Sequence, residues 1–171
     1  ENIEVLRFTD QDFDFASFIS EDNTPQEPLN FSGTNKNDVL VGTNFKDVIK
    51  GLKGKDNIYG KEGDDYIYGD SGKDKLYGED GDDYLEGGSS KDKLYGGNGN
   101  DELHGGSSKD KLYGGAGNDK LYGDSSHDYL KGHAGEDVLF GGTGNDYLRG
   151  GDDGDTLYGE IGNDKLKGED G

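Results

Sequence analysis

The 171-residue chain is 33% charged and only 27% hydrophobic, and its net charge is −20. A chain of this composition does not usually bury enough apolar surface to offset the entropy of ordering. Its acidity argues against direct binding of nucleic acid, and its short apolar runs argue against direct membrane insertion by this segment. The chain has no cysteine, which excludes disulfides and thiolate metal sites.

Residues 1–32 differ from the rest of the chain because they concentrate bulky apolar side chains, among them Phe13, Phe15 and Phe18. Both prolines, Pro25 and Pro28, lie in the turn-rich stretch that ends this segment. We interpret residues 1–32 as an N-terminal cap and linker for the region that follows. The alternative is that they form the end of a preceding domain.

From Gly33 to Lys167 the chain is an unbroken series of fifteen nonapeptides of the form G-x-x-x-x-D-x-(L/I)-x. Most copies also have glycine at the fourth position, as in residues 96–104. Self-similarity at so short a period predicts a solenoid. The series, residues 33–171, stops inside a sixteenth repeat, so we expect the chain to be a fragment of a longer protein.

The last three positions of each repeat alternate polar, apolar and polar or aromatic, which predicts a half-buried strand of three residues. The first six positions are glycine-rich and predict a turn. Two repeats then make one coil of eighteen residues, and successive coils stack as parallel strands about 4.8 Å apart. We therefore predict an all-β fold, a parallel β-roll of two facing sheets, with leucine and isoleucine inside and positions seven and nine facing solvent.

An eighteen-residue period is also visible in the side chains. Position five alternates between a lysine series and an acidic or amide series, namely Lys55, Lys73, Lys91 and Lys109 against Asp64, Asp82, Asn100 and Asn118. The two edges of the roll should therefore differ chemically. Tyrosine recurs at the same period in position nine, at Tyr59, Tyr77, Tyr95 and Tyr113. These rings should form an outward ladder that serves sheet packing rather than ligand binding.

The turn G-x-x-G-x-D combines glycines, which can take left-handed angles and bring carbonyls inward, with a carboxylate. Two such turns stacked on one edge offer an all-oxygen shell, and a shell of about six to eight oxygens suits calcium better than magnesium. We found no nucleophile or phosphate-loop motif, so we expect neither a catalytic nor an organic-cofactor site. The three histidines, His104, His127 and His133, are expected in solvent-facing loops rather than as metal ligands.

The nonapeptide resembles the RTX (repeats-in-toxin) family, whose repeat is a calcium-binding β-helix motif. The resemblance implies a β-roll that binds calcium between turns of the same edge, through carbonyls and the aspartates of both turns. Carried over by position, the aspartate ligands are Asp56, Asp65, Asp74, Asp83, Asp92, Asp101, Asp110, Asp119, Asp128, Asp137, Asp146, Asp155 and Asp164. The matching fourth-position glycines are Gly54, Gly63, Gly72, Gly81, Gly99, Gly117, Gly135 and Gly144.

Some repeats depart from the pattern at the fourth position. Serine replaces glycine there at Ser90, Ser108 and Ser126, so the sites beside these residues should be weaker, rearranged or empty. The first two repeats have Lys36 and Phe45 at this position, and we do not expect them to bind calcium in the usual way. About 8–12 calcium ions would then bind, close to the number that neutralises the net charge.

The resemblance further implies a calcium-binding module of a large, secreted, toxin-like bacterial protein, located outside the cell or on the bacterial surface. Such a module is disordered without calcium, passes through type I secretion machinery unfolded, and folds on meeting calcium outside. We expect it to be monomeric and not an enzyme. Two alternatives are an accessory β-roll of a secreted protease, lipase or alginate epimerase, and a rod segment of an RTX adhesin.

Overall fold

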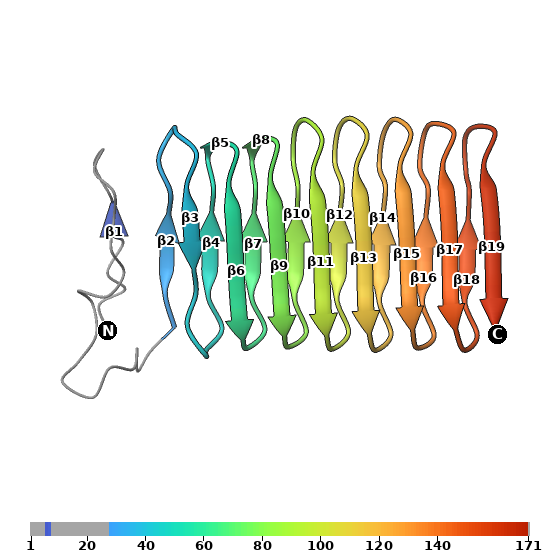
Figure 1. Ribbon diagram of the computed structural model, residues 1–171, viewed down its shortest axis with the longest axis horizontal. Coiled ribbons are helices and arrows are strands. Elements are labelled where there is room, and N and C mark those ends of the chain that lie inside the picture. The colour runs from blue at the N-terminus through green and yellow to red at the C-terminus, as the bar shows by residue number, and fades with distance from the viewer. Residues whose placement is uncertain (1–5, 8–27, 171) are drawn as a thin grey trace.

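The computed structural model describes residues 6–7 and 28–170, and all regular structure in these residues is β-strand. Most of the expected N-terminal cap, residues 1–32, lies outside the described residues. Within the part of the chain that is described, no helix is long and apolar enough to span a membrane. The strands stand side by side in a long row, with turns along an upper and a lower edge (Figure 1).

Two large sheets contain almost all of the strands. The nine-stranded sheet has the order β1 (Leu6–Arg7), β2 (Asn30–Ser32), β4 (Val48–Lys50), β7 (Tyr66–Tyr68), β10 (Tyr84–Glu86), β12 (Glu102–His104), β14 (Lys120–Tyr122), β16 (Val138–Phe140) and β18 (Thr156–Tyr158). The eight-stranded sheet has the order β19 (Lys165–Asp170), β17 (Tyr147–Asp152), β15 (Tyr129–Ala134), β13 (Lys111–Ala116), β11 (Lys93–Asn98), β9 (Lys75–Asp80), β6 (Asn57–Glu62) and β3 (Val39–Val41). A short ladder on the upper edge pairs β5 (Lys53–Gly54) with β8 (Ser71–Gly72).

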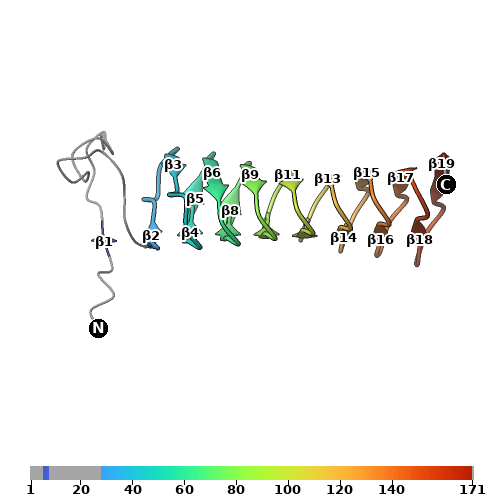
Figure 2. The same cartoon turned by 90° about the horizontal axis from the view of Figure 1, so that it is seen from below.

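Within the repeats, each strand of a large sheet pairs in parallel with the strand eighteen residues further along the chain. Leu85 is opposite Leu103 in one sheet, and Leu94 is opposite Leu112 in the other. Consecutive repeats therefore alternate between the two sheets, which form two separate layers when the molecule is turned (Figure 2). The predicted parallel β-roll with eighteen residues per coil is confirmed.

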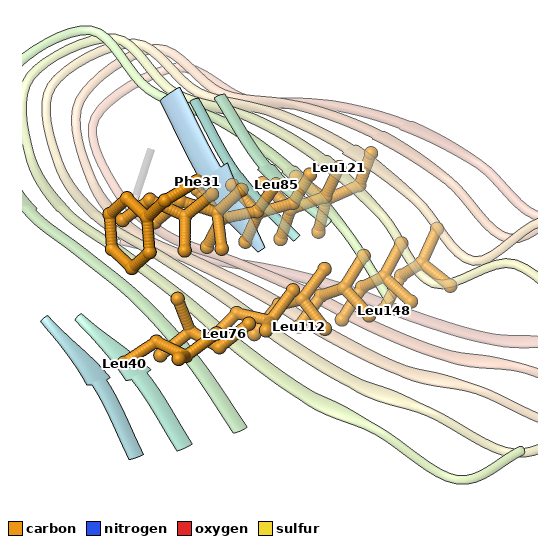
Figure 3. Close-up of a cluster of buried hydrophobic side chains, with 14 residues drawn as sticks. Phe31, Leu40, Leu76, Leu85, Leu112, Leu121 and Leu148 are labelled. Atoms are coloured by element: carbon orange, nitrogen blue, oxygen red, sulfur yellow. The ribbon is translucent and has the colours of Figure 1, made fainter. Parts of the chain in front are cut away.

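The core consists of two facing rows of apolar side chains, one from each sheet (Figure 3). From Ile49 to Leu148 every eighth-position leucine or isoleucine is fully buried. Phe31, nine residues before Leu40, occupies the same register and is also buried, although no repeat glycine precedes it. Each strand therefore contributes a single side chain to the core.

The predicted strand length is correct for one sheet and wrong for the other. In the nine-stranded sheet the strands within the repeats have three residues, but from β6 onward the strands of the eight-stranded sheet have six. They continue past the first glycine because the turn has the same shape in each coil, so that its backbone groups find partners in the next coil. The Gly99 N–H, for example, donates to the Ala116 carbonyl at 2.8 Å.

The predicted tyrosine ladder is confirmed on the outer face of the eight-stranded sheet. The rings of Tyr59, Tyr77, Tyr95 and Tyr113 stack with centroids 4.8–5.0 Å apart and planes within 6°. A second ladder on the other sheet contains His104, Tyr122, Phe140 and Tyr158. In both ladders the face of each inner ring is covered by its neighbours, which agrees with a packing role.

Candidate metal centre

Each repeat from the first to the fifteenth places its aspartate at the end of a turn, directly before a strand. The upper edge in Figure 1 has the turns that end at Asp38, Asp56, Asp74, Asp92, Asp110, Asp128, Asp146 and Asp164. The lower edge has the turns that end at Asp47, Asp65, Asp83, Asp101, Asp119, Asp137 and Asp155. The aspartates from Asp47 to Asp146 are buried, so each edge has a row of interior carboxylates.

One oxygen of each carboxylate links neighbouring coils. The backbone N–H of an aspartate donates to the Oδ1 atom of the aspartate eighteen residues further on, as from Asp101 to Asp119 at 2.8 Å. The same bond recurs along both edges at 2.7–3.0 Å. This bond fixes the orientation of the carboxylate and leaves its second oxygen for another partner.

The second oxygen, Oδ2, has no such partner in most repeats. Among the described residues, twelve aspartates have a buried Oδ2 atom without a hydrogen bond: Asp56, Asp65, Asp74, Asp83, Asp92, Asp101, Asp110, Asp119, Asp128, Asp137, Asp146 and Asp155. Buried polar atoms in folded proteins almost always have a partner. A row of unpaired carboxylate oxygens therefore indicates a cation as the missing partner.

Backbone carbonyls surround the same space. A Cβ atom placed on Gly69 would lie 2.9 Å from Asp74 Oδ2 and 2.7 Å from the carbonyl oxygen of Gly87, in the next coil. At the fourth position, a Cβ on Gly81 would collide with the Gly63 carbonyl of the previous coil. The gap between two turns is thus lined by carboxylate and carbonyl oxygens, the ligand chemistry of calcium.

No group of three or more histidine, cysteine, aspartate or glutamate side chains suited to a metal gathers in residues 6–7 and 28–170. The interior carboxylates of an edge instead follow one another singly, coil after coil. A cation between two turns would therefore take at most the two neighbouring aspartates and complete its shell with carbonyls. This donor set fits calcium, for which backbone carbonyls are ordinary ligands.

Burial dominates the electrostatics of the interior carboxylates. It raises the pKa of Asp92, Asp110 and Asp119 to about 8, against the opposing effect of the backbone hydrogen bond that each accepts. The same cause raises the pKa to about 7 at Asp65, Asp101 and Asp128, and to about 6 at Asp56, Asp74, Asp83 and Asp137. These groups therefore favour either a proton or a bound cation.

The first two repeats close their turns differently. Thr43 donates its backbone N–H to Asp47 Oδ2 at 2.5 Å, and its hydroxyl lies 3.0 Å from the same oxygen. Thr34 makes the equivalent bonds to Asp38 Oδ2, at 2.7 and 3.0 Å. The oxygen that lacks a partner in later repeats is thus satisfied by a threonine here. A threonine at the second position of the repeat therefore distinguishes these two turns in the sequence.

Backbone angles separate the same two repeats from the rest. From Gly51 onward, the second and fourth residues of every repeat have positive φ, whereas no residue of the first two repeats does. At the fourth position of the upper edge, φ is 141–154° at Gly54, Gly72, Gly144 and Gly162, but 85–99° at Ser90, Ser108 and Ser126. The serine turns therefore keep the left-handed conformation with altered angles. Gly162 has the same geometry as the predicted glycines but was absent from the predicted set.

The expectation that the histidines lie in loops is wrong for two of them. His104 is half-buried in strand β12, with Nε2 3.0 Å from Glu102 Oε1, and His133 lies in strand β15. His127 lies in a turn, where its Nδ1 atom accepts the Asn145 N–H at 2.9 Å. These positions follow from the register of the repeat. His104 is at position nine, which belongs to a strand, and His133 is at position two of a lower-edge turn, where the strand of the eight-stranded sheet continues.

Fold and site together define a calcium-binding β-solenoid. The model of the RTX calcium-binding nonapeptide repeat family matches in overlapping segments that together span residues 32–171, and the chain belongs to this family. No curated protein matches the chain. The RTX repeat is a structural calcium-binding element and not a catalytic one.

The raised pKa values predict that calcium binding weakens in acid. A carboxyl whose folded pKa exceeds the unfolded value of about 3.9 stabilises the metal-free roll below that value and loses this contribution as pH rises through about 6–8. Without calcium, β structure should therefore be greater at about pH 4 than at about pH 8. Because calcium must displace these protons, its midpoint should rise as pH falls from 8 to 6. Circular dichroism without calcium tests the first expectation, and calcium titrations at several pH values test the second. A calcium midpoint that does not change with pH would contradict the role of these carboxylates as calcium ligands.

The serine turns predict a stabilising substitution. Ser108→Gly should increase the free energy of unfolding at fixed calcium by about 1 kcal/mol, because a left-handed conformation is unfavourable for a residue with a side chain. Ser107→Gly is the matched control, since Ser107 lies in the same turn without positive φ. Urea unfolding at fixed calcium measures the free energy of unfolding of both variants. An equal gain from Ser107→Gly would show that the backbone angle is not the cause.

Proposed function

We propose that the chain binds calcium in the gaps between successive turns on each edge of the roll. The observation that carries this proposal is the row of twelve buried Oδ2 atoms without hydrogen bonds. The ligands are the aspartates from Asp56 to Asp164 given above, together with carbonyls that include those of the fourth-position glycines. Six gaps on the upper edge and five on the lower edge separate these aspartates, so about eleven ions are expected, a number that also offsets the charge of −20.

Calcium binding makes the module a conformational switch. With 27% hydrophobic residues and a large negative charge, the chain has too little apolar surface to fold alone. Where calcium is scarce the chain is disordered, and where it reaches about millimolar concentration, as outside cells, weak sites fill and the roll forms. Binding energy is then folding energy.

This switch suits a module of a large secreted bacterial protein of the toxin-like kind. A chain that is unfolded in the calcium-poor cytosol can pass through a type I secretion channel, and its folding outside opposes backsliding. The module then functions outside the cell or on the bacterial surface, as a monomer. Membership in the RTX family and the composition support this proposal.

Calcium-driven folding has a direct test. Far-ultraviolet circular dichroism of the chain in chelator at neutral pH should show disorder, and calcium at about millimolar concentration should produce β signal cooperatively. Magnesium at the same concentration should do much less, because it retains its waters and demands a stricter octahedron. Equal β content with and without chelator would contradict the proposal.

The position of an aspartate predicts the effect of its removal. Asp101 adjoins two gaps, so Asp101→Ala should remove the ions of both and interrupt stacking, whereas Asp164→Ala affects one gap among the described residues. Asp47→Ala removes a carboxylate that Thr43 already satisfies, and should lower stability without changing the number of ions. Calorimetric titration measures stoichiometry and midpoint for all three. Similar losses from Asp101→Ala and Asp164→Ala would count against sites shared between stacked turns.

A further inference from the structure

The outer face of the eight-stranded sheet has a grid of lysines that calcium binding does not explain. Three consecutive coils contain the sequence Lys-Asp-Lys-Leu-Tyr, at residues 73–77, 91–95 and 109–113. In each, the aspartate and leucine are buried while the lysines and tyrosine are exposed or half-buried. The in-register pairing of β9, β11 and β13 places Lys75, Lys93 and Lys111 opposite one another in a row. Another row, Lys73, Lys91 and Lys109, recurs two residues earlier in the upper-edge turns that lead into these strands. We call these six residues the lysine face.

The lysine face concentrates positive charge on a protein with a net charge of −20. Its six lysines are a third of the chain's 18 lysine and arginine residues. Among the ion pairs of the described residues, none includes any of the six. Strands of a sheet are about 4.8 Å apart, and like charges directly opposite one another destabilise a sheet. Repetition of this unfavourable arrangement in three coils points to an anion supplied from outside.

The two lysine rows differ in their relation to the metal sites. Lys73, Lys91 and Lys109 each precede an interior aspartate, and the charge of Lys109 acts to lower the pKa of Asp128. This row therefore offsets part of the negative charge of the upper edge. Lys75, Lys93 and Lys111 contribute to no such shift and lie beside the stacked ring of a tyrosine. In this second row Lys111 Nζ lies 5.9 Å from the ring centroid of Tyr129, whereas no ion pair or cation–π contact of the described residues includes Lys75 or Lys93.

We propose that the lysine face binds a linear acidic polysaccharide that runs along the roll, across the strands. A flat row of charges repeated once per coil matches a polymer that has an acidic group at regular intervals. The half-buried tyrosines Tyr77, Tyr95 and Tyr113 add hydroxyl groups, which can donate and accept hydrogen bonds to sugar hydroxyls.

The tyrosine ladder also favours an acidic polysaccharide over single-stranded nucleic acid as the partner. Proteins that bind single strands present open aromatic faces on which bases stack. Here the ring centroids of Tyr77, Tyr95 and Tyr113 are 4.9–5.0 Å apart in parallel planes, so neighbouring rings cover the faces. A polyanion without bases fits this surface better.

The lysine face forms only when the coils are stacked. Its dependence on calcium therefore rests on the proposed calcium-driven folding. Binding to the polysaccharide should therefore need calcium, and should weaken as salt rises because the contacts are exposed charges. Circular dichroism of each sample reports folding separately, so that failure to fold and failure to bind are distinguishable.

The test compares two triple variants of the full chain in millimolar calcium. Lys75→Gln, Lys93→Gln and Lys111→Gln together remove the second row, while Lys46→Gln, Lys50→Gln and Lys120→Gln change the net charge equally away from the lysine face. Probes are heparin, oligogalacturonate too short to gel with calcium, neutral dextran and oligothymidylate. The first variant should bind heparin or oligogalacturonate about tenfold more weakly than the unsubstituted chain, because three exposed ion pairs of ordinary strength are lost. Lys→Arg at the same three positions should retain binding.

Several results would overturn the proposal. Equal loss in the two glutamine variants would mean that only net charge matters. Binding of oligothymidylate as tight as that of the polysaccharides would assign the face to nucleic acid, and binding of dextran would remove the role of charge. Absence of binding to both acidic polysaccharides by the folded chain would also refute it, whereas a preference between the two identifies sulfate or carboxylate as the recognised group.

Discussion

The structure depends on carboxylate oxygens that are buried without a hydrogen-bond partner. A buried polar group left unsatisfied costs about 1–3 kcal/mol, and more when it is charged. Twelve such groups in one roll therefore cost more than the net stability of a typical domain, about 5–15 kcal/mol. A partner that binds these oxygens at neutral pH would remove this cost. At neutral pH, protons bind mainly those carboxyls whose pKa is raised to about 7 or 8, and calcium is the proposed partner of the row as a whole.

This constraint explains the composition of the repeat. The first position is glycine because a side chain there would enter the space shared by the Asp Oδ2 atom and a carbonyl of the next coil. The second and fourth positions take positive φ, which turns their carbonyls toward the neighbouring turn. Only the eighth position remains for the apolar core, so that each strand buries one leucine or isoleucine. The repeat therefore combines a narrow apolar core with turns whose oxygens suit a cation.

The period of nine residues was enough to predict the fold, since the spacing of Asp101 and Leu103 within a repeat determines which residues face inward. Three features were not predictable from this period. Strand β11 extends to Asn98 because backbone groups of identical turns pair between coils, which a pattern of side chains does not display. Phe31 enters the core without a repeat glycine. Thr43 bonds Asp47 Oδ2 locally, so this aspartate has the register of a calcium ligand although its second oxygen already has a partner within the protein.

The threonine turns show that the aspartate has two separable tasks. From Asp56 to Asp164 the Oδ1 atom accepts the backbone N–H of the aspartate in the previous coil, and this link also joins Asp47 to Asp65 at 2.7 Å. The second oxygen, Oδ2, accepts hydrogen bonds from Thr43 in Asp47 but has no hydrogen-bond partner in Asp65. Since each coil of a solenoid contacts only its neighbours, stacking can pass from one kind of turn to the next without an ion between them. Residues 33–50 thus present to the coils that follow a neighbour whose own carboxylates already have partners in the protein.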